Sequence, residues 1–265
     1  MKEHNNIFHS PEIQGILNSV NEITGQKLSD EYSQSFSSFR KYTENYKSTS
    51  LADWPESPKL KIWYRRLAVG ILIDVRSSFC CVNYHYERIE QLEKALIDSI
   101  DKFDYKKLIG ESSIKLGDTK RIDFEYQAFV LAYRRCLDLL TRAISARFKN
   151  DFHSFRKLDK FLENFSGDKI ADELILTHNK FSSQFEFVMS SGNRKSIRDK
   201  ISHYEYVPAL TFNLNKSGMI FFGGGENMRP NFSNPEEVSL SYILKSRLDT
   251  LNICISEMIN ILIND

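Results

Sequence analysis

The sequence predicts an all-α fold, a helical bundle with one small β-hairpin inserted before the C-terminal helix. Three observations predict this class. Apolar residues recur every three or four positions through most of the chain, as the buried face of a helix requires. Two short aromatic-rich runs within 210–225 flank Asn215-Lys216-Ser217-Gly218, which is the pattern of a hairpin turn. After the hairpin a helical stripe resumes and continues to the C-terminus.

Residues 1–56 are expected to form a helical extension that packs on the main body. Ser10-Pro11-Glu12 combines a hydroxyl cap, a proline in the first turn and an acid near the positive end of the helix dipole, and Gly25 can end this helix. A second, short amphipathic helix is indicated by Tyr32, Phe36 and Phe39. The expected domain division is an N-terminal helical extension at 1–56 and a helical domain at 57–265.

Two long helices are expected next. The first begins at residue 57 and continues to Ile100, with a break expected near Asn83. Residues 105–122 have two glycines and no clear period, which predicts a loop. The clearest helix spans 123–148, with a stripe made of Phe129, Ala132, Tyr133, Cys136, Leu137, Leu140, Ala143 and Ile144. Its charged residues off the stripe are interpreted as solvated or bridging charges, namely Arg134, Arg135, Asp138 and Arg142.

The remaining helices follow from breaks and caps. A short helix is expected at 152–165 and a longer one from Lys169 to Met189. Ser191-Gly192-Asn193 interrupts the pattern, and Asn193 can cap a further helix that must end before Pro208. After the hairpin, Asn234-Pro235-Glu236-Glu237 is expected to open the last helix, whose stripe is Leu244, Leu248, Leu251, Ile255, Met258 and Leu262.

Composition limits the function classes. The 265 residues include 36 Lys+Arg and 35 Asp+Glu, so nucleic acid can be bound only through a local basic patch or an assembled interface. The four cysteines lack the spacing of a zinc site and are interpreted as reduced core residues, namely Cys80, Cys81, Cys136 and Cys254. The longest apolar run, at 67–73, is far shorter than the ~20 residues of a membrane span, so a soluble, cytoplasmic protein without membrane contact is expected.

One stretch, SIRDKISHYEYV at 196–207, combines groups that can act on a phosphate. A guanidinium such as that of Arg198 grips phosphate oxygens, and an imidazole such as that of His203 can transfer a proton near neutral pH. Five helical positions turn the direction by about 140°, so these two side chains do not share a face, whereas Asp199 and His203 do. The neighbouring candidates for RNA contact are Arg194, Lys195, Lys200 and Tyr204, three cations and a ring on which a base can stack.

An arginine followed directly by a polar residue and, five positions on, by a histidine resembles the motif of the HEPN superfamily, and the long helix upstream agrees with that setting. The resemblance covers roughly 57–265. It implies a metal-independent endoribonuclease without a cofactor, often a toxin or defence effector, in which two copies of the chain join their motifs across a cleft. The ribose 2′-OH would attack the adjacent phosphate, leaving a 2′,3′-cyclic phosphate and a 5′-OH. His203 would be the general acid or base, Arg198 would stabilise the phosphorane, and Asp199 would orient one of them.

The resemblance also defines expected partners and alternatives. RNA, a second copy of the chain and an antitoxin or defence-system protein are the implied partners. In pairs with a nucleotidyltransferase antitoxin, a tyrosine two places after the histidine is modified, but here that position is Glu205. A looser match, Arg147 with His153, is interpreted as chance because Phe148 follows the arginine. The alternative functions are a non-catalytic dimerisation or partner-binding module and an unrelated helical scaffold, in which the trio is only a surface ion-pair cluster.

Overall fold

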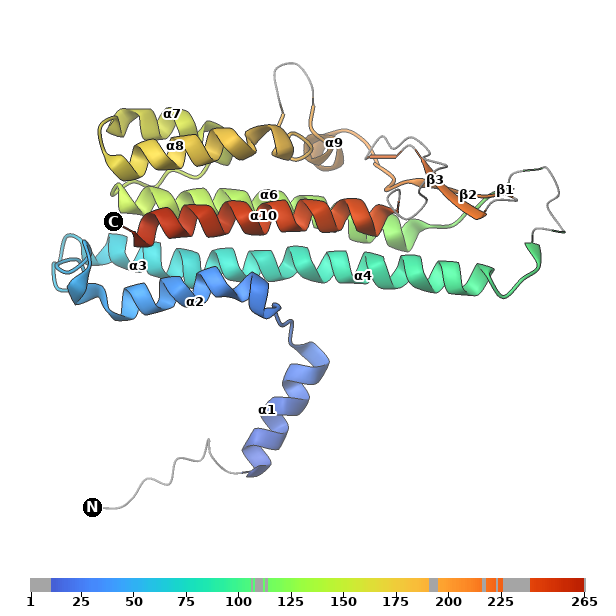
Figure 1. Ribbon diagram of the computed structural model, residues 1–265, viewed down its shortest axis with the longest axis horizontal. Helices are drawn as coiled ribbons and strands as arrows, with labels where there is room; N and C mark the ends of the chain where they lie inside the picture. Colours follow the sequence, from blue (N-terminus) through green and yellow to red (C-terminus); the bar gives the residue numbers. More distant parts are fainter. Residues whose placement is uncertain are drawn as a thin grey trace.

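The computed structural model describes residues 11–105, 107, 112, 114–190, 195–215, 218–222, 224–225 and 239–264. Three long helices lie side by side along its long axis, α4 (Arg76–Ile100), α6 (Lys120–Arg147) and α10 (Leu240–Ile263) (Figure 1). A small sheet lies near one end, and α2 (Asp30–Glu44) and α8 (Lys169–Ser182) cover opposite sides of the long helices. The predicted class, a mostly α-helical bundle with a small hairpin before the C-terminal helix, is confirmed.

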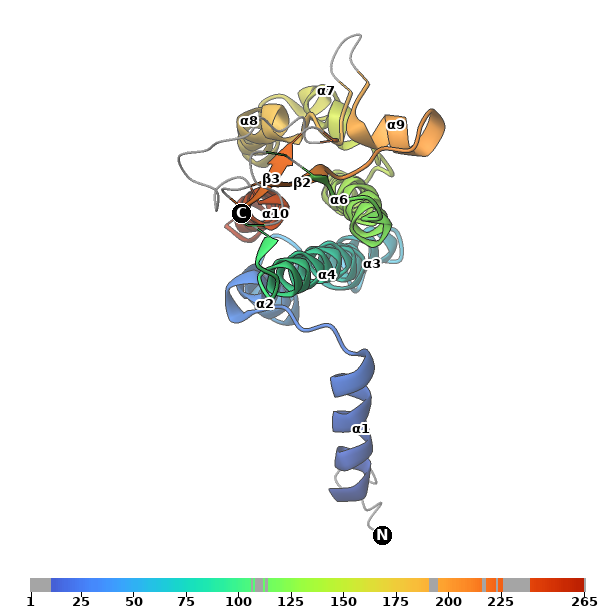
Figure 2. The same ribbon diagram turned by 90° about the vertical axis from the view of Figure 1, so that its right-hand side faces the viewer.

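The two N-terminal helices differ in what they contact. Helix α1 (Pro11–Thr24) stands away from the bundle in both views (Figures 1 and 2), and its Ile16 and Val20 are 59% and 51% exposed. Helix α2 begins at the cap Ser29 and buries the predicted stripe of Tyr32, Phe36 and Phe39 in the main core. The hydroxyl of Tyr32 donates to Asp249 of α10 at 2.5 Å, which joins α2 to the body.

The helical run that follows is continuous from Lys61 to Ile100. It consists of α3 (Lys61–Val69), a π-helical turn η3 (Gly70–Val75) and α4. The expected break near Asn83 is wrong. This residue is buried and donates to Glu87 one turn later at 2.7 Å, so its amide is satisfied inside the helix. The irregularity lies at Gly70 instead, where a Cβ atom would come within 2.8 Å of the Cβ of Ala143 on α6.

The same run, Lys61–Ile100, is the one helix among the described residues that is long and apolar enough to cross a membrane by length and composition. Its most apolar window is 44% buried inside the protein. The residues of its stripe face the core, and those that are almost completely buried are Leu67, Ile71, Val75, Phe79 and Val82. The run is therefore compatible with the interior helix of a soluble protein.

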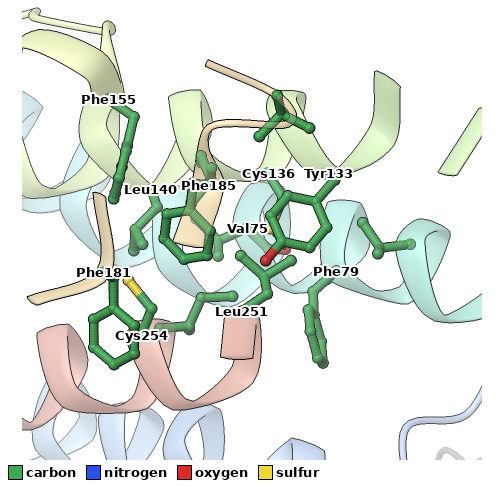
Figure 3. Close-up of a cluster of buried hydrophobic side chains, with 14 of the residues drawn as sticks. Val75, Phe79, Tyr133, Cys136, Leu140, Phe155, Phe181, Phe185, Leu251 and Cys254 are labelled. Carbon is green, nitrogen blue, oxygen red and sulfur yellow. Dashed lines mark hydrogen bonds between the residues drawn. The ribbon is translucent and has the colours of Figure 1, made fainter. Parts of the chain in front are cut away.

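Helix α6 provides the centre of the core. All eight residues of its predicted stripe are buried. The ring of Tyr133 lies in edge-to-face contact with Phe187, with centroids 4.8 Å apart, and its hydroxyl donates to the carbonyl of Arg247 on α10 at 2.9 Å. Figure 3 shows Tyr133, Phe185 and Leu251 converging from different elements on this region. The core therefore forms where the apolar stripes of the long helices meet.

In the part of the chain that the structure describes, the sheet has three strands. The predicted hairpin is β2 (Thr211–Asn215) and β3 (Gly218–Phe222), paired antiparallel with Thr211 opposite Phe222. A third strand, β1 (Ile114–Lys115), pairs antiparallel with β2 and lies in the segment that was expected to be only a loop. Both of its residues are exposed and it is two residues long, so no alternating pattern in the sequence could reveal it.

Short helices and caps complete the fold. The predicted helix at 152–165 consists of η4 (Phe155–Lys157), α7 (Leu158–Leu162) and η5 (Glu163–Phe165), and α8 continues into η6 (Ser183–Phe185). A further single turn, η2 (Tyr46–Ser48), follows α2. The expected start of the last helix at Asn234 lies outside the described residues. In the described part, Ser239 caps α10, and the buried carboxylate of Glu93 accepts the backbone N–H groups of Leu240 and Ser241 at 3.0 Å.

The cysteines divide into two kinds. Cys136 and Cys254 are buried, as the sequence indicated, and burial raises the pKa of both thiols. Cys80 is half-buried and Cys81 is exposed on α4, so the interpretation of all four as core residues is wrong for this pair.

The contact between Gly70 and Ala143 gives a stability prediction. Gly70→Ala ordinarily gains about 0.5–1 kcal/mol in a helix, but the clash with Ala143 costs about 1–3 kcal/mol because neither backbone can withdraw without opening the core. We expect thermal unfolding to show Tm lowered by roughly 2–8 °C. Gly15→Ala on α1, where nothing lies within 4 Å, is the control and should not lower Tm. The double variant Gly70→Ala/Ala143→Gly should be more stable than the sum of the two single effects predicts, because the smaller residue at 143 removes the clash. A Gly70→Ala protein as stable as wild type would contradict the argument.

Candidate functional site

Helix α9 (Ile197–His203) carries the motif. Its cap is Ser196, which is 4% exposed and whose hydroxyl accepts the backbone N–H of Asp199 at 3.1 Å. Residues 191–194 lie outside the described residues, so Asn193 is not described and the helix begins four residues after it. The backbone N–H of Arg198 donates to the carbonyl of Phe187 at 3.3 Å, which ties the first turn to the segment after α8.

Asp199 is the anchor of this turn. Its carboxylate accepts hydrogen bonds from Ser190, from Ser196 at 2.9 Å and from the Nη1 of Arg198 at 3.0 Å. Burial raises the pKa of the Asp199 carboxyl, but the three hydrogen bonds together outweigh burial, so its pKa lies below the ordinary value. The stabilisation from this carboxylate is therefore present near neutral pH and is lost only as the pH falls through the lowered pKa.

Arg198 and His203 have different neighbours within one chain. Arg198 forms an ion pair with Asp199, and the side chain of Arg198 lines a surface pocket. His203 is the last residue of α9, is exposed, and lies in edge contact with Tyr204, with centroids 6.1 Å apart. Of these two residues, Arg198 is the one that contacts Asp199.

The predicted RNA-binding residues are partly engaged by their neighbours. The Nζ of Lys195 lies 3.2 Å from the centre of the Tyr204 ring, so a cation covers one face of this exposed aromatic. Lys200 forms an ion pair with Glu205 at 3.5 Å. Arg194 lies outside the described residues. A base could therefore stack on Tyr204 from its other side only.

Arg198 lies in a pocket that sequence reasoning did not assign. The pocket has a volume of about 550 Å³, and four arginines line it together with one histidine. We name it the arginine pocket; its lining is Leu131, Arg134, Arg135, Asp138, Leu139, Arg142, Asp151, His153 and Arg198. The α6 residues among them follow a spacing of three or four positions, which is the signal of this second stripe in the sequence. The prediction that its charges are solvated or bridging agrees with the ion pairs of Arg134 and Arg142 but does not indicate a pocket.

Two aspartates position the arginines. Asp138 accepts the Nε–H of Arg134 at 2.8 Å and the backbone N–H of Phe155 at 3.1 Å. Asp151 accepts the Nε–H of Arg142 at 3.0 Å and lies 3.1 Å from Nη1 of Arg66 on α3. The hydrogen bond from Arg142 lowers the pKa of the Asp151 carboxyl, slight burial opposes this, and the charges of Arg142, Arg66 and His153 lower it further.

The turn after α6 brings Asp151 and His153 to the pocket. The helix ends at Arg147, and Lys149 has a φ of 56°, the left-handed conformation that commonly ends helices. The buried hydroxyl of Ser145 accepts the backbone N–H of Phe152 at 3.1 Å and lies 2.9 Å from the carbonyl of Asn150. This serine therefore folds the chain back beside the last turns of α6, where His153 shares a pocket with Arg198.

The segment after α9 is held by one buried carboxylate on α6. Asp123 is 5% exposed and accepts the hydroxyl of Tyr206 at 2.8 Å and the backbone N–H of Ala209 at 2.7 Å. Gln127, one turn later, donates to the carbonyl of Val207 at 3.0 Å. These bonds attach the end of the motif segment to the same helix that carries the pocket arginines.

A histidine–carboxylate pair joins α4 to α6. The Nδ1 of His85 on α4 lies 2.7 Å from Glu125 on α6. The two residues are 40 positions apart, so spacing could not reveal the pair. Among the residues that the structure describes, no group of three or more histidine, cysteine or carboxylate side chains is arranged to hold a metal ion.

The attachment through Asp123 gives a pH prediction. Burial raises the pKa of Tyr206, and the hydrogen bond to Asp123 and its charge raise it further, to about 12, against an ordinary value of about 10. The bond is therefore intact below about pH 10 and is lost as the pH rises towards 12. The ultraviolet pH titration of Tyr206→Phe, subtracted from that of wild type, should isolate the ionisation of the Tyr206 hydroxyl. The same difference measured in an Asp123→Ala background should have a lower midpoint, because the hydrogen bond and the charge of Asp123 are gone. Tyr204→Phe is the matched control, since it also removes one exposed tyrosine of this segment but leaves the bond to Asp123. A midpoint near 10 in the difference between wild type and Tyr206→Phe would contradict the assignment.

Comparisons with protein-family models, with curated proteins and with solved structures return no match to this chain. The function therefore has to be argued from the chemistry of α9 and of the arginine pocket.

Proposed function

We propose that this protein is a metal-independent endoribonuclease of the HEPN type that acts as a homodimer. One observation carries the proposal: Arg198 of the motif projects into a pocket where three further arginines and a histidine collect. A phosphodiester carries one negative charge, and guanidinium groups bind its oxygens through paired N–H donors. RNA is therefore the substrate whose chemistry suits the site, and a cytoplasmic toxin or defence effector, controlled by an antitoxin or another defence-system protein, is the proposed role.

The proposed reaction is cleavage by the substrate's own 2′-OH. A base removes the 2′-OH proton, the oxygen bonds to the adjacent phosphorus, and the bond from phosphorus to the 5′ oxygen breaks as an acid gives that oxygen a proton. The products are a 2′,3′-cyclic phosphate and a 5′-OH. Arg198 stabilises the charge that builds on the phosphorane, and Asp199 orients Arg198 through their 3.0 Å contact.

The proton transfers need His203, and here the proposal requires a second chain. Within one chain His203 is exposed at the end of α9 and does not line the pocket that holds Arg198. Two copies facing each other across α9 would supply two histidines, one to accept the 2′-OH proton and one to protonate the leaving oxygen. Their exposure leaves both imidazoles accessible to such a neighbour.

The second candidate is a non-catalytic module that dimerises or binds a partner protein. It is favoured by exposed apolar residues that repeat on one face of α3 and the π turn, Ile62, Val69 and Ile73. Such a stripe on the surface is typical of a protein contact. In this case Arg198 and Asp199 would be a surface ion pair, contributing less than about 1 kcal/mol.

Incubation of the purified protein with a mixed RNA substrate in EDTA tests the first proposal. Wild type should cleave and leave cyclic phosphates, because no step uses a metal ion. His203→Ala and Arg198→Ala should each lower the cleavage rate by roughly 10²–10⁴-fold, the usual contribution of a proton-transfer or charge-stabilising group. The readouts are the rate and the chemistry of the new ends.

Arg88→Ala on α4 is the matched control, because Arg88 contacts Gln91 on its own helix. It should cleave like wild type, and circular dichroism should show all variants folded. Wild-type protein that is dimeric but inactive would favour the binding module. Cleavage that survives both His203→Ala and Arg198→Ala would overturn the assignment of these residues.

A further inference from the structure

The arginine pocket holds more positive charge than its own acids neutralise. Its lining has four arginines against two aspartates. Of these aspartates, Asp151 is already shared between Arg142 and Arg66, which lies just outside the pocket. Arg135 is exposed and forms no ion pair among the described residues. An excess of cations in a hollow, unlike scattered cations on a convex surface, focuses potential on one place and attracts an anion.

The pocket arginines also have N–H donors that their ion pairs do not use. A guanidinium has five N–H groups. Within the described chain, the ion pair of Arg134 uses its Nε–H, that of Arg142 uses its Nε–H, and that of Arg198 uses Nη1. The aspartates therefore fix the orientation of these side chains without using up their donors, which is how a preorganised anion site is built.

A second hollow continues the first. It has a volume of about 300 Å³, shares Leu139 and Arg142 with the arginine pocket, and adds Arg65 and Arg66 of α3 against one acid, Asp74 of the π turn. Helices α9, α6 and α3 lie on the same side of the bundle in Figure 2, and both α9 and α3 pack on α6. The cations thus form a track from Arg198, across α6, to α3. An elongated ligand with repeated negative charges fits such a track better than a single anion does.

We propose that this track binds the sugar–phosphate backbone of a single RNA strand, with one phosphate held in the arginine pocket by Arg135 and Arg142 and the strand continuing towards Arg66. The inference rests on the proposed function for the identity of the ligand. It assigns binding to residues of α6 and α3 that lie outside the motif, and it places His153 beside the bound phosphate.

The test is a binding titration with a fluorescent, fully 2′-O-methylated RNA oligonucleotide, which has no 2′-OH and cannot be cleaved through it. Arg135→Gln and Arg142→Gln should each weaken binding roughly fivefold to tenfold at low salt. Each should also reduce the slope of log affinity against log salt by about 0.7, the value for one phosphate contact on a single strand. Arg88→Gln is the control and should change neither quantity. Thermal unfolding checks that the variants keep the fold, because both side chains are exposed.

The outcomes separate this inference from the proposed activity. Weakened binding by the two variants supports the track even if wild type never cleaves natural RNA, whereas unchanged affinity and salt slope overturn it even if wild type does cleave. A parallel titration with adenosine monophosphate separates a strand from a small ligand. If the mononucleotide binds through Arg135 and Arg142 while the oligonucleotide does not bind, the RNA track is overturned.

Discussion

The fold depends on the two-sided character of α6. One side of this helix is fully buried, and Tyr133 with its neighbours joins the stripes of α4 and α10 into one core. The opposite side carries the arginines that line the pocket. Because α3, α9 and the turn after α6 all pack against this same helix, their charged side chains are placed relative to a rigid element. A site built on such an element keeps its geometry better than one built on loops alone.

Carboxylates connect this framework to the candidate site, and each makes more than one bond. Asp123 holds a tyrosine hydroxyl and a backbone N–H of the segment after α9. Asp138 orients Arg134 and also fixes the start of η4. Asp199 closes the first turn of α9 and holds Arg198. Since each acid is satisfied by several donors, removing one would free both a backbone segment and a side chain of the site.

The elements with long apolar stripes could be predicted from the sequence, and the contacts between distant residues could not. Helices α2, α6 and α10 bury the stripes that periodicity indicates, because burial of one face dictates their pattern. Strand β1 is too short to have a pattern, and the close approach of Gly70 in the π turn joins it to Ala143, 73 positions later. The pairing of His85 with Glu125 is of the same kind.

In the candidate site, too, contacts between neighbours in the chain could be predicted and contacts between distant residues could not. The spacing of Arg198 and His203 predicts that they do not share a face. Asp199 lies beside Arg198 because the two are adjacent in the chain. The pocket was missed because its members come from α6, the following turn and α9, and only the fold brings them together. His153 is the clearest case, since its link to Arg198 depends on the reversal of the chain around Ser145 and not on its distance in sequence from Arg147.

The exposed thiol of Cys81 gives the molecule a built-in reporter of this charged surface. Burial raises the pKa of this thiol, and the positive charge of Arg135 lowers it, so its reactivity is set by a balance that includes a pocket residue. An anion seated against Arg135 would cancel the lowering contribution and leave less thiolate at a given pH. The rate at which a thiol reagent modifies Cys81 would then fall as the pocket fills, while the buried Cys136 and Cys254 stay unreactive. Half-buried Cys80 also lies on α4, so the modification has to be followed at Cys81 itself. Its rate then reports occupancy of the pocket on the neighbouring helix without an introduced cysteine.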